Sequence, residues 1–162
     1  MVKNMSKSIY ITTFIFFLNF FVSFHCFPKG DLSRQDPIEI KVFMKGINGK
    51  GHFFEPSTLN FETGKLYKMI LINNSDSKHY FASNSFSKAI FTRKIQVLKN
   101  QKKISEIKGV ISEVEVFPDN QIEWWFIPIQ TGSFDDLICH IEDKVANKKH
   151  EDMGMRGKII IK

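Results

Sequence analysis

The sequence predicts an all-β domain, built as a sandwich of two sheets. Beyond residue 37 there is hardly any amphipathic helical periodicity, and short runs rich in β-branched and aromatic residues alternate with turn residues. About eight such runs fall within residues 38–162, a strand number typical of two sheets packed on one core. The length of 162 residues and the hydrophobic content of 43% fit a single domain of this kind.

A targeting segment is predicted ahead of this domain. Lys3 and Lys7 precede an apolar stretch that is too short, and too interrupted by polar residues, for a typical membrane span. We expect a signal peptide over residues 1–27, with an uncleaved N-terminal anchor as the alternative, and a polar linker over 28–37. The protein is therefore expected in the periplasm or an equivalent extracytoplasmic compartment, tethered to a membrane only if the segment is retained.

The first strands are predicted from alternation and turn residues. Residues 38–44 alternate apolar and polar side chains, residues 52–64 are interrupted by Pro56, and residues 65–74 alternate before a polar turn. The turn Asp76–Phe86 follows.

Residues 87–110 are predicted to be an insertion, because they exceed what a small sandwich needs at this point. "FSKAIF" fits a helical turn, and "KIQVL" with "KISEIKG" fits a hairpin. The basic run over 92–103 lacks interleaved aromatic residues and the net charge is a mild +6, so a solvated hairpin face is favoured and no nucleic-acid partner is expected. The last strands are predicted over 112–120, 121–129, 132–140 and 157–162.

Two pairs of adjacent residues in these last strands are expected to have structural roles only. Neighbours on a strand face opposite ways, so one of Trp124 and Trp125 is expected in the core and the other outside. Asp135 and Asp136 are expected to form a solvated edge without a partner acid or base. The sequence has no phosphate-binding glycine loop, G-x-S-x-G or H-E-x-x-H motif, so an electron carrier or binding protein is favoured over an enzyme.

The two cysteines leave several chemistries open. Cys26 leaves with a signal peptide cleaved after it, and Cys139 is then a lone thiol in an oxidising compartment. Cys139 is either a buried inert thiol or a metal thiolate, and a Cys26–Cys139 disulfide requires that Cys26 survives processing.

Residues that bind soft metals gather around Cys139 in the predicted topology. Cys139 ends one strand, the loop before the last strand carries His150, Met153 and Met155, and His79 lies in a turn after another strand. Strand ends and loops of this kind converge at one pole of a sandwich. One thiolate, two imidazoles and a thioether favour copper, whereas zinc more readily takes cysteine and histidine alone.

From about residue 38 to 162 the chain resembles the cupredoxins, the plastocyanin and azurin type of Greek-key β-sandwich. The resemblance rests on "FEPSTLNFETGKLYKMILINN", "KHYF", "EVEVFPDNQIEWWFIPIQTGSFDDLICH" and "HEDMGMRGKIIIK", the last fitting the register H-x-x-x-G-M-x-G. It implies a single copper ion held by His79 and His150, the Cys139 thiolate and a weak axial Met155. Ten residues separate Cys139 from His150, more than the family usually has.

The other candidate residues take lesser roles. His140 would face away from Cys139 and is a substitute ligand only if the long loop carries His150 off. Met153 is expected to pack, with exchange for Met155 as the alternative, and His52 to be structural or at the surface. Backbone groups near Asn74 or Asn84 are expected to donate hydrogen bonds to the thiolate.

The resemblance implies an exported mononuclear copper protein that transfers single electrons between Cu(I) and Cu(II) with a redox partner protein. Three alternatives stay open: a copper-delivery module with a copper donor or acceptor as its partner, a subunit or domain of a larger oxidoreductase that docks through 87–110, and a metal-free interaction domain.

Overall fold

The computed structural model describes residues 30–100 and 102–162, so the expected signal peptide over 1–27 lies outside the described residues. Residues 31–162 form one compact unit. None of the helices in these two described ranges has the length and apolarity that crossing a membrane requires.

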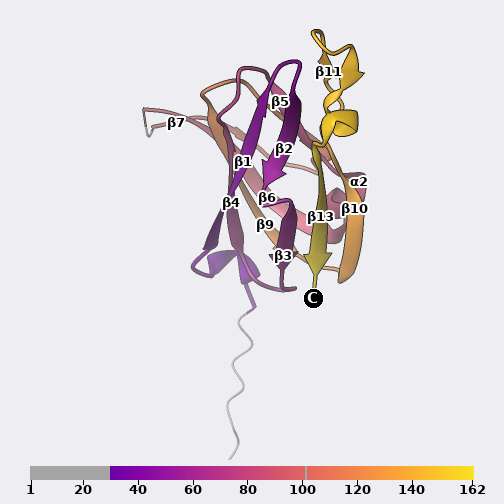
Figure 1. Cartoon of the computed structure of the whole chain (residues 1–162). Coiled ribbons are helices and arrows are strands. Elements are labelled where there is room, and N and C mark those ends of the chain that lie inside the picture. The colour runs from indigo at the N-terminus through magenta and orange to yellow at the C-terminus, as the bar shows by residue number, and fades with distance from the viewer. Residues whose placement is uncertain (1–29, 101) are drawn as a thin grey trace, which may run out of the picture. The chain divides into compact units, whose positions relative to one another are not determined.

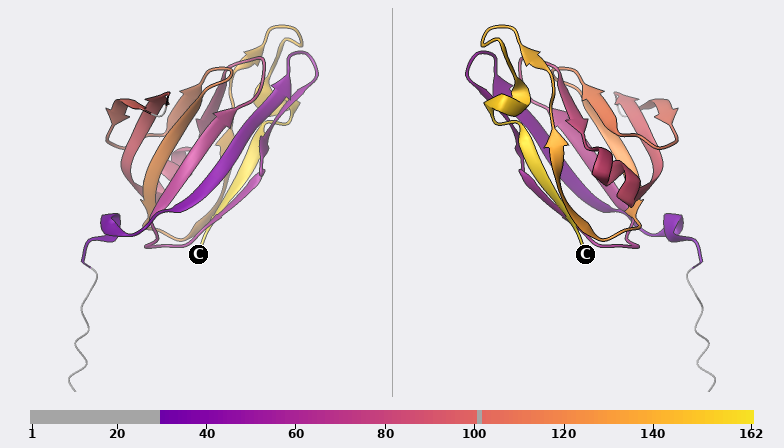
Figure 2. Two further views of the ribbon diagram at one scale, coloured as in Figure 1. Left: turned by 90° about the vertical axis from the view of Figure 1, so that its left-hand side faces the viewer. Right: turned by 90° about the vertical axis from the view of Figure 1, so that its right-hand side faces the viewer.

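The unit is a sandwich of two sheets, which face opposite sides of the molecule in Figure 2. The first sheet has six strands in the order β2-β1-β4-β9-β6-β7, with β1 parallel to β4 and every other pair antiparallel. Its strands are β1 (Ile38–Ile47), β2 (Gly51–Glu55), β4 (Tyr67–Asn73), β6 (Ile90–Lys99), β7 (Lys102–Ile107) and β9 (Gln121–Pro128).

The second sheet has five strands in the order β3-β13-β10-β5-β8, with β3 parallel to β13. Its strands are β3 (Thr58–Phe61), β5 (His79–Ala82), β8 (Glu113–Val116), β10 (Gly132–Ile138) and β13 (Arg156–Ile161). Four further short elements are the 3-10 turns η1 (Leu32–Arg34) and η2 (His150–Met153) and the paired strands β11 (Glu142–Asp143) and β12 (Lys148–Lys149). The prediction of an all-β sandwich is confirmed.

Aromatic side chains fill the space between the sheets. Trp124 is 1% exposed and meets Phe81 and Phe86 edge to face, with ring centroids 6.0 and 5.8 Å apart. Its indole Nε1 donates to the Thr92 hydroxyl at 3.1 Å, so the only polar atom of the ring is not left unpaired in the core. Trp125 lies on the outer face beside the ammonium group of Lys94, which confirms the predicted alternation.

The segment predicted as an insertion is largely part of the first sheet. The helical turn is present as α2 (Asn84–Ala89), whose N-terminus is capped by the Ser83 hydroxyl, and the hairpin is present as β6 and β7. However, β6 also pairs with β9 and buries Ile90 and Ile95, so it belongs to the sheet. Only β7, whose six residues are all exposed, extends beyond a minimal sandwich, and it forms the edge of the sheet.

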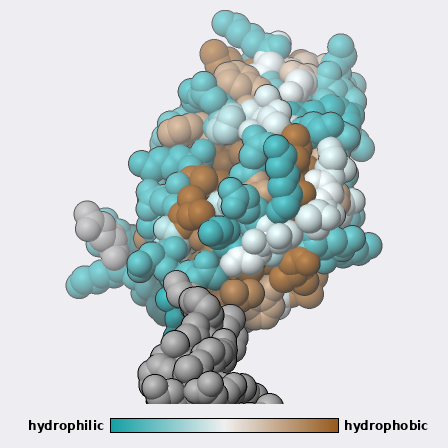
Figure 3. Space-filling model, turned by 90° about the horizontal axis from the view of Figure 1, so that it is seen from below, coloured by the Kyte–Doolittle hydropathy of each residue, from teal (hydrophilic) through white to brown (hydrophobic). Residues whose placement is uncertain are grey.

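One pole of the sandwich carries the β11–β12 hairpin together with η2 (Figure 1). Seen from the opposite pole, the surface is largely hydrophilic, with apolar side chains in small separate patches (Figure 3).

Candidate metal centre

The four predicted ligand residues lie at the ends of neighbouring elements. His79 begins β5, Cys139 follows β10, His150 begins η2, and Met155 directly precedes β13. All four are 0% exposed. The sandwich thus brings two imidazoles, a thiol and a thioether into one buried cluster, although His79 precedes Cys139 by 60 residues.

Three of the four donor atoms converge on a single point. His79 Nδ1 lies 3.1 Å from His150 Nδ1, and Cys139 Sγ lies 3.7 Å from the first and 3.5 Å from the second. Nitrogen and sulfur ligands at the roughly 2.0–2.3 Å typical of metal sites, with angles of about 100–120° between them, lie about 3.1–3.8 Å apart. The three atoms are therefore spaced as ligands of one small ion.

The ten residues between Cys139 and His150 form a hairpin whose two ends lie side by side. β11 and β12 pair as a small hairpin, with Glu142 opposite Lys149. At its base, His150 N donates to Ile141 O at 2.7 Å, and Glu151 N donates to Cys139 O at 2.9 Å. The chain therefore leaves and returns at the same place, and the extra length does not displace His150.

Gly154, in the left-handed backbone conformation, links η2 to Met155. Gly154 has φ of 108°, which favours glycine, and the turn lets Met155 N donate to His150 O at 2.9 Å. Cys139 N in turn donates to Met155 O at 3.2 Å. Met155 is fully buried whereas Met153 is partly exposed on η2, which favours Met155 of the two; its role as an axial ligand stays a prediction.

The surroundings of His79 determine its tautomer. His79 Nε2 lies 2.7 Å from Ser75 Oγ, and that hydroxyl has two carbonyl acceptors, Asn73 Oδ1 at 2.7 Å and Ser77 O at 2.8 Å. Because the single proton of Ser75 is directed to a carbonyl, the hydroxyl accepts from His79 Nε2–H. Nδ1 of the neutral ring is then the unprotonated nitrogen, and it faces Cys139 and His150.

Both histidines are neutral at physiological pH. Burial, followed by the nearby imidazoles of His150 and His52, lowers the pKa of His79 to about 3. Burial, followed by His52, lowers the pKa of His150 to about 4. Neutral imidazole is the form that binds metal, so no proton has to be removed from either ring at pH 7.

The Cys139 thiol is held in its protonated form when no cation is present. Burial raises its pKa, and the backbone N–H of Tyr80, which donates to Sγ at 3.2 Å, opposes that effect. Donors were expected near Asn74 or Asn84, and that expectation was wrong: they are Tyr80, because β5 runs beside the end of β10, and Ile141, two residues after the cysteine. A bound cation would favour the thiolate, and the Tyr80 N–H would then donate to a charged acceptor.

His52 is the neighbour of the site that the sequence did not single out. It is 1% exposed, and its ring stacks on His150 with centroids 3.6 Å apart and planes 20° apart. One nitrogen from each of His52, His79 and His150 lies within 4.8 Å of the others. The available signal was the alternation of β2, which places His52 on the same inward face as Phe54.

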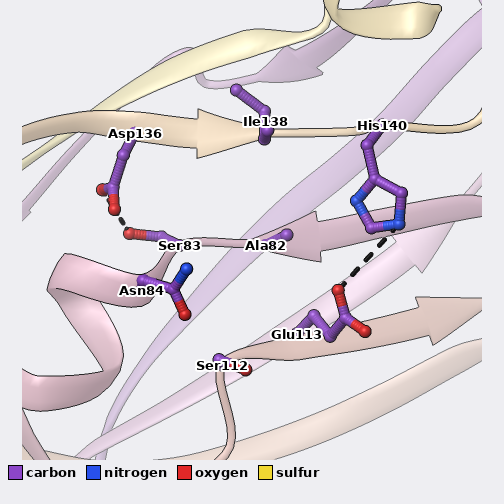
Figure 4. A pocket seen from close by; sticks show the side chains of 8 residues that line it. All are labelled: Ala82, Ser83, Asn84, Ser112, Glu113, Asp136, Ile138 and His140. Atoms are coloured by element: carbon purple, nitrogen blue, oxygen red, sulfur yellow. Dashed lines mark hydrogen bonds and ion pairs between the residues drawn. The ribbon is translucent and has the colours of Figure 1, made fainter.

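His140 belongs to a separate pocket of about 220 Å³ on the outer surface (Figure 4). Its ring stacks on Tyr80 and its Nε2 lies 3.9 Å from Glu113 Oε2. Asp136 also lines this pocket and accepts from the Ser83 hydroxyl at 2.6 Å and from Ser85 N at 2.8 Å. Asp136 is therefore only partly solvated and is fixed against the start of α2. The expectation that neither carboxylate has a partner base was wrong for Asp135, whose Oδ1 lies 3.1 Å from Lys158 Nζ.

No protein-family model and no curated protein matches this sequence. Among solved structures, the chain is similar to a multicopper oxidase from Campylobacter jejuni described as a metallo-oxidase, with 18% identity and a TM-score of 0.53. It is also similar to copper nitrite reductases from Nitrosomonas europaea, with 11% identity and a TM-score of 0.53, and from Thermus scotoductus, with 12% identity and a TM-score of 0.54.

These matches cover 78%, 80% and 79% of this chain, but only 30%, 51% and 32% of the three neighbours. At such identities the likeness concerns the fold. The chain is therefore a cupredoxin-fold protein, with a buried cluster of two histidines, a cysteine and a methionine at one pole. It spans about a third to a half of the length of these neighbours, so their activities are not transferred to it.

Proposed function

We propose that this chain is an exported copper protein that transfers single electrons, with one copper ion held by His79, Cys139 and His150 and with Met155 as a weak fourth ligand. The observation that carries the proposal is the convergence of two Nδ1 atoms and one Sγ atom at mutual distances of 3.1–3.7 Å. A thiolate, two imidazoles and a thioether are the donor set that suits both oxidation states of copper.

A bound copper ion would supply the one-electron couple between Cu(I) and Cu(II). The contribution of the chain is a cluster whose donors are already in place: Ser75 directs Nδ1 of His79 inward, and the backbone of Tyr80 donates to the sulfur of Cys139. Donors held in this way change little when the charge of the site changes, which favours rapid electron exchange. Three neighbours of the same fold are described as copper enzymes, which supports the choice of metal.

Complete burial of the donors supports a resident ion over a delivered one. His79, Cys139 and His150 are all 0% exposed, so a copper acceptor could not reach them without rearrangement of the pole. The partner we propose is a redox protein, and the location is the periplasm or an equivalent compartment, tethered only if the N-terminal segment is retained.

The test is the visible spectrum of the domain after addition of Cu(II). We expect thiolate-to-copper charge transfer that disappears in Cys139→Ser and is lost or strongly altered in His150→Gln. His140→Gln is the matched control, since it removes the imidazole next to Cys139 in sequence and should leave the spectrum unchanged. Absence of retained copper after dialysis of the unmutated domain would overturn the proposal in favour of a metal-free domain.

A further inference from the structure

A cover hairpin, formed by residues 141–149, lies against His150. Its residues Ile141, Glu142, Lys144 and Val145 line a pocket with His150, and His150 itself is 0% exposed. The cover hairpin consists of only two short strands joined by a turn, and a pair of two-residue strands has little stability of its own. Contacts outside these two strands are therefore needed to hold the hairpin against His150.

The buried carboxylate of Asp143 provides that support. Its Oδ1 accepts from Val145 N at 2.8 Å and Ala146 N at 2.9 Å, within the cover hairpin. Its Oδ2 accepts from Gly49 N at 2.6 Å, in the turn between β1 and β2, and from His52 Nε2 at 3.1 Å. These four donors hold the pKa of the Asp143 carboxyl below its usual range, so the group is a carboxylate and His52 Nε2 carries the proton.

His52 connects this carboxylate to the metal centre. Its ring stacks on that of His150, so the lone pairs of the two rings lie in two nearly parallel planes, with centroids 3.6 Å apart, and do not meet on one ion. Its Nδ1 faces the backbone instead: a Cβ at Gly46 would lie 2.2 Å from that atom. His52 is therefore a support for the His150 ring and not a further ligand of the same ion.

We propose that Asp143 and His52 are positioning residues of the copper centre, which close the cover hairpin over His150 and hold its imidazole in one plane. Release of copper then requires the cover hairpin to open. The identity of the ion rests on the function proposed above, whereas the contacts themselves do not.

Asp143→Asn tests the carboxylate with little change of volume. The amide supplies one acceptor oxygen in place of two, so at least one of the Gly49, Val145 and Ala146 amides loses its partner. We expect hydrogen exchange at these amides to become about tenfold faster or more in the metal-free protein, with exchange in β4 and β9 unchanged. Glu142→Gln is the matched control, because it removes an exposed carboxylate from the same hairpin.

The copper-loaded protein gives the second readout. Outer contacts of this kind typically affect metal affinity by about 10- to 100-fold, and we expect Asp143→Asn to speed transfer of Cu(I) to a soluble chelator by a similar factor. His52→Phe keeps a flat ring against His150 but cannot donate to Asp143. It should accelerate transfer as well, and it should alter the electron paramagnetic resonance spectrum of the Cu(II) form, which Glu142→Gln should not.

Unchanged exchange at Gly49, Val145 and Ala146 in Asp143→Asn would overturn the proposal, as would unchanged copper transfer in both variants. If the unmutated protein retains no copper, the proposed function fails and the copper part of this inference fails with it. The exchange measurement on metal-free protein still decides separately whether Asp143 holds the cover hairpin.

Discussion

The Ser75 hydroxyl is the contact that determines which nitrogen of His79 faces the metal centre. It accepts from Nε2 at 2.7 Å and donates its own hydrogen bond to a carbonyl of Asn73 or Ser77. Ser75→Ala removes the acceptor and leaves a buried N–H without a partner. An unsatisfied buried donor costs about 1–3 kcal/mol, and the lost preference for one tautomer should lower copper affinity by about 10- to 100-fold.

Ser77→Ala is a close control. The Ser77 hydroxyl is buried and has no hydrogen-bond partner among the described residues, so its removal should leave the unfolding free energy unchanged or raise it. The assay is urea unfolding of both metal-free variants, followed by competition for Cu(I) with a chelator of known affinity. Equal stability and equal copper affinity in Ser75→Ala and Ser77→Ala would refute the tautomer argument.

Three further predictions concern the two histidines, the turn before Met155 and the core. The pKa values of His79 and His150 are lowered in the folded state, so below about pH 6.5 the unfolded chain binds more protons than the folded one. The unfolding free energy of the metal-free protein should therefore fall as the pH is lowered from 7 to 5. The expected slope is up to about 1.4 kcal/mol per pH unit for each histidine. Urea midpoints that stay constant over this range would contradict the shifts. Gly154→Ala should lower the unfolding free energy by about 1–3 kcal/mol and accelerate hydrogen exchange of the Met155 amide, because φ is 108° there and the new Cβ would lie 3.2 Å from His52 O. Gly109→Ala is the control: its φ is 131° but its Cβ would meet nothing within 4 Å, so exchange of the Met155 amide should be unchanged. Phe86→Ala should lower the unfolding free energy by about 3–5 kcal/mol, measured in urea, because Phe86 is 0% exposed; a loss below 1 kcal/mol would show that the core collapses around the gap.

The strands were predictable because their information is local. Alternation along β1 indicated which side chains face inward, and Pro56 marked the break between β2 and β3. The role of residues 87–110 could not be predicted in this way, because β6 belongs to the sheet only through its pairing with β9, some thirty residues further along the chain. Nothing within β6 itself distinguishes a sheet strand from one arm of an inserted hairpin.

The candidate ligands were predictable for a similar reason. His79, Cys139 and His150 are residue types suited to copper, and each lies at a predicted strand end or in a loop that converges on one pole. The supporting contacts were not predictable. The His52–Asp143 bond joins residues 91 apart in sequence, and the donor to Cys139 is a backbone amide, which leaves no trace in the residue type.

The most direct test of the central claim is X-ray absorption at the copper edge on the protein loaded with one equivalent of copper. We expect one sulfur at thiolate distance and two imidazoles around the metal, with the thiolate contribution lost in Cys139→Ser. A spectrum of the unmutated protein that fits nitrogen and oxygen neighbours alone would contradict it.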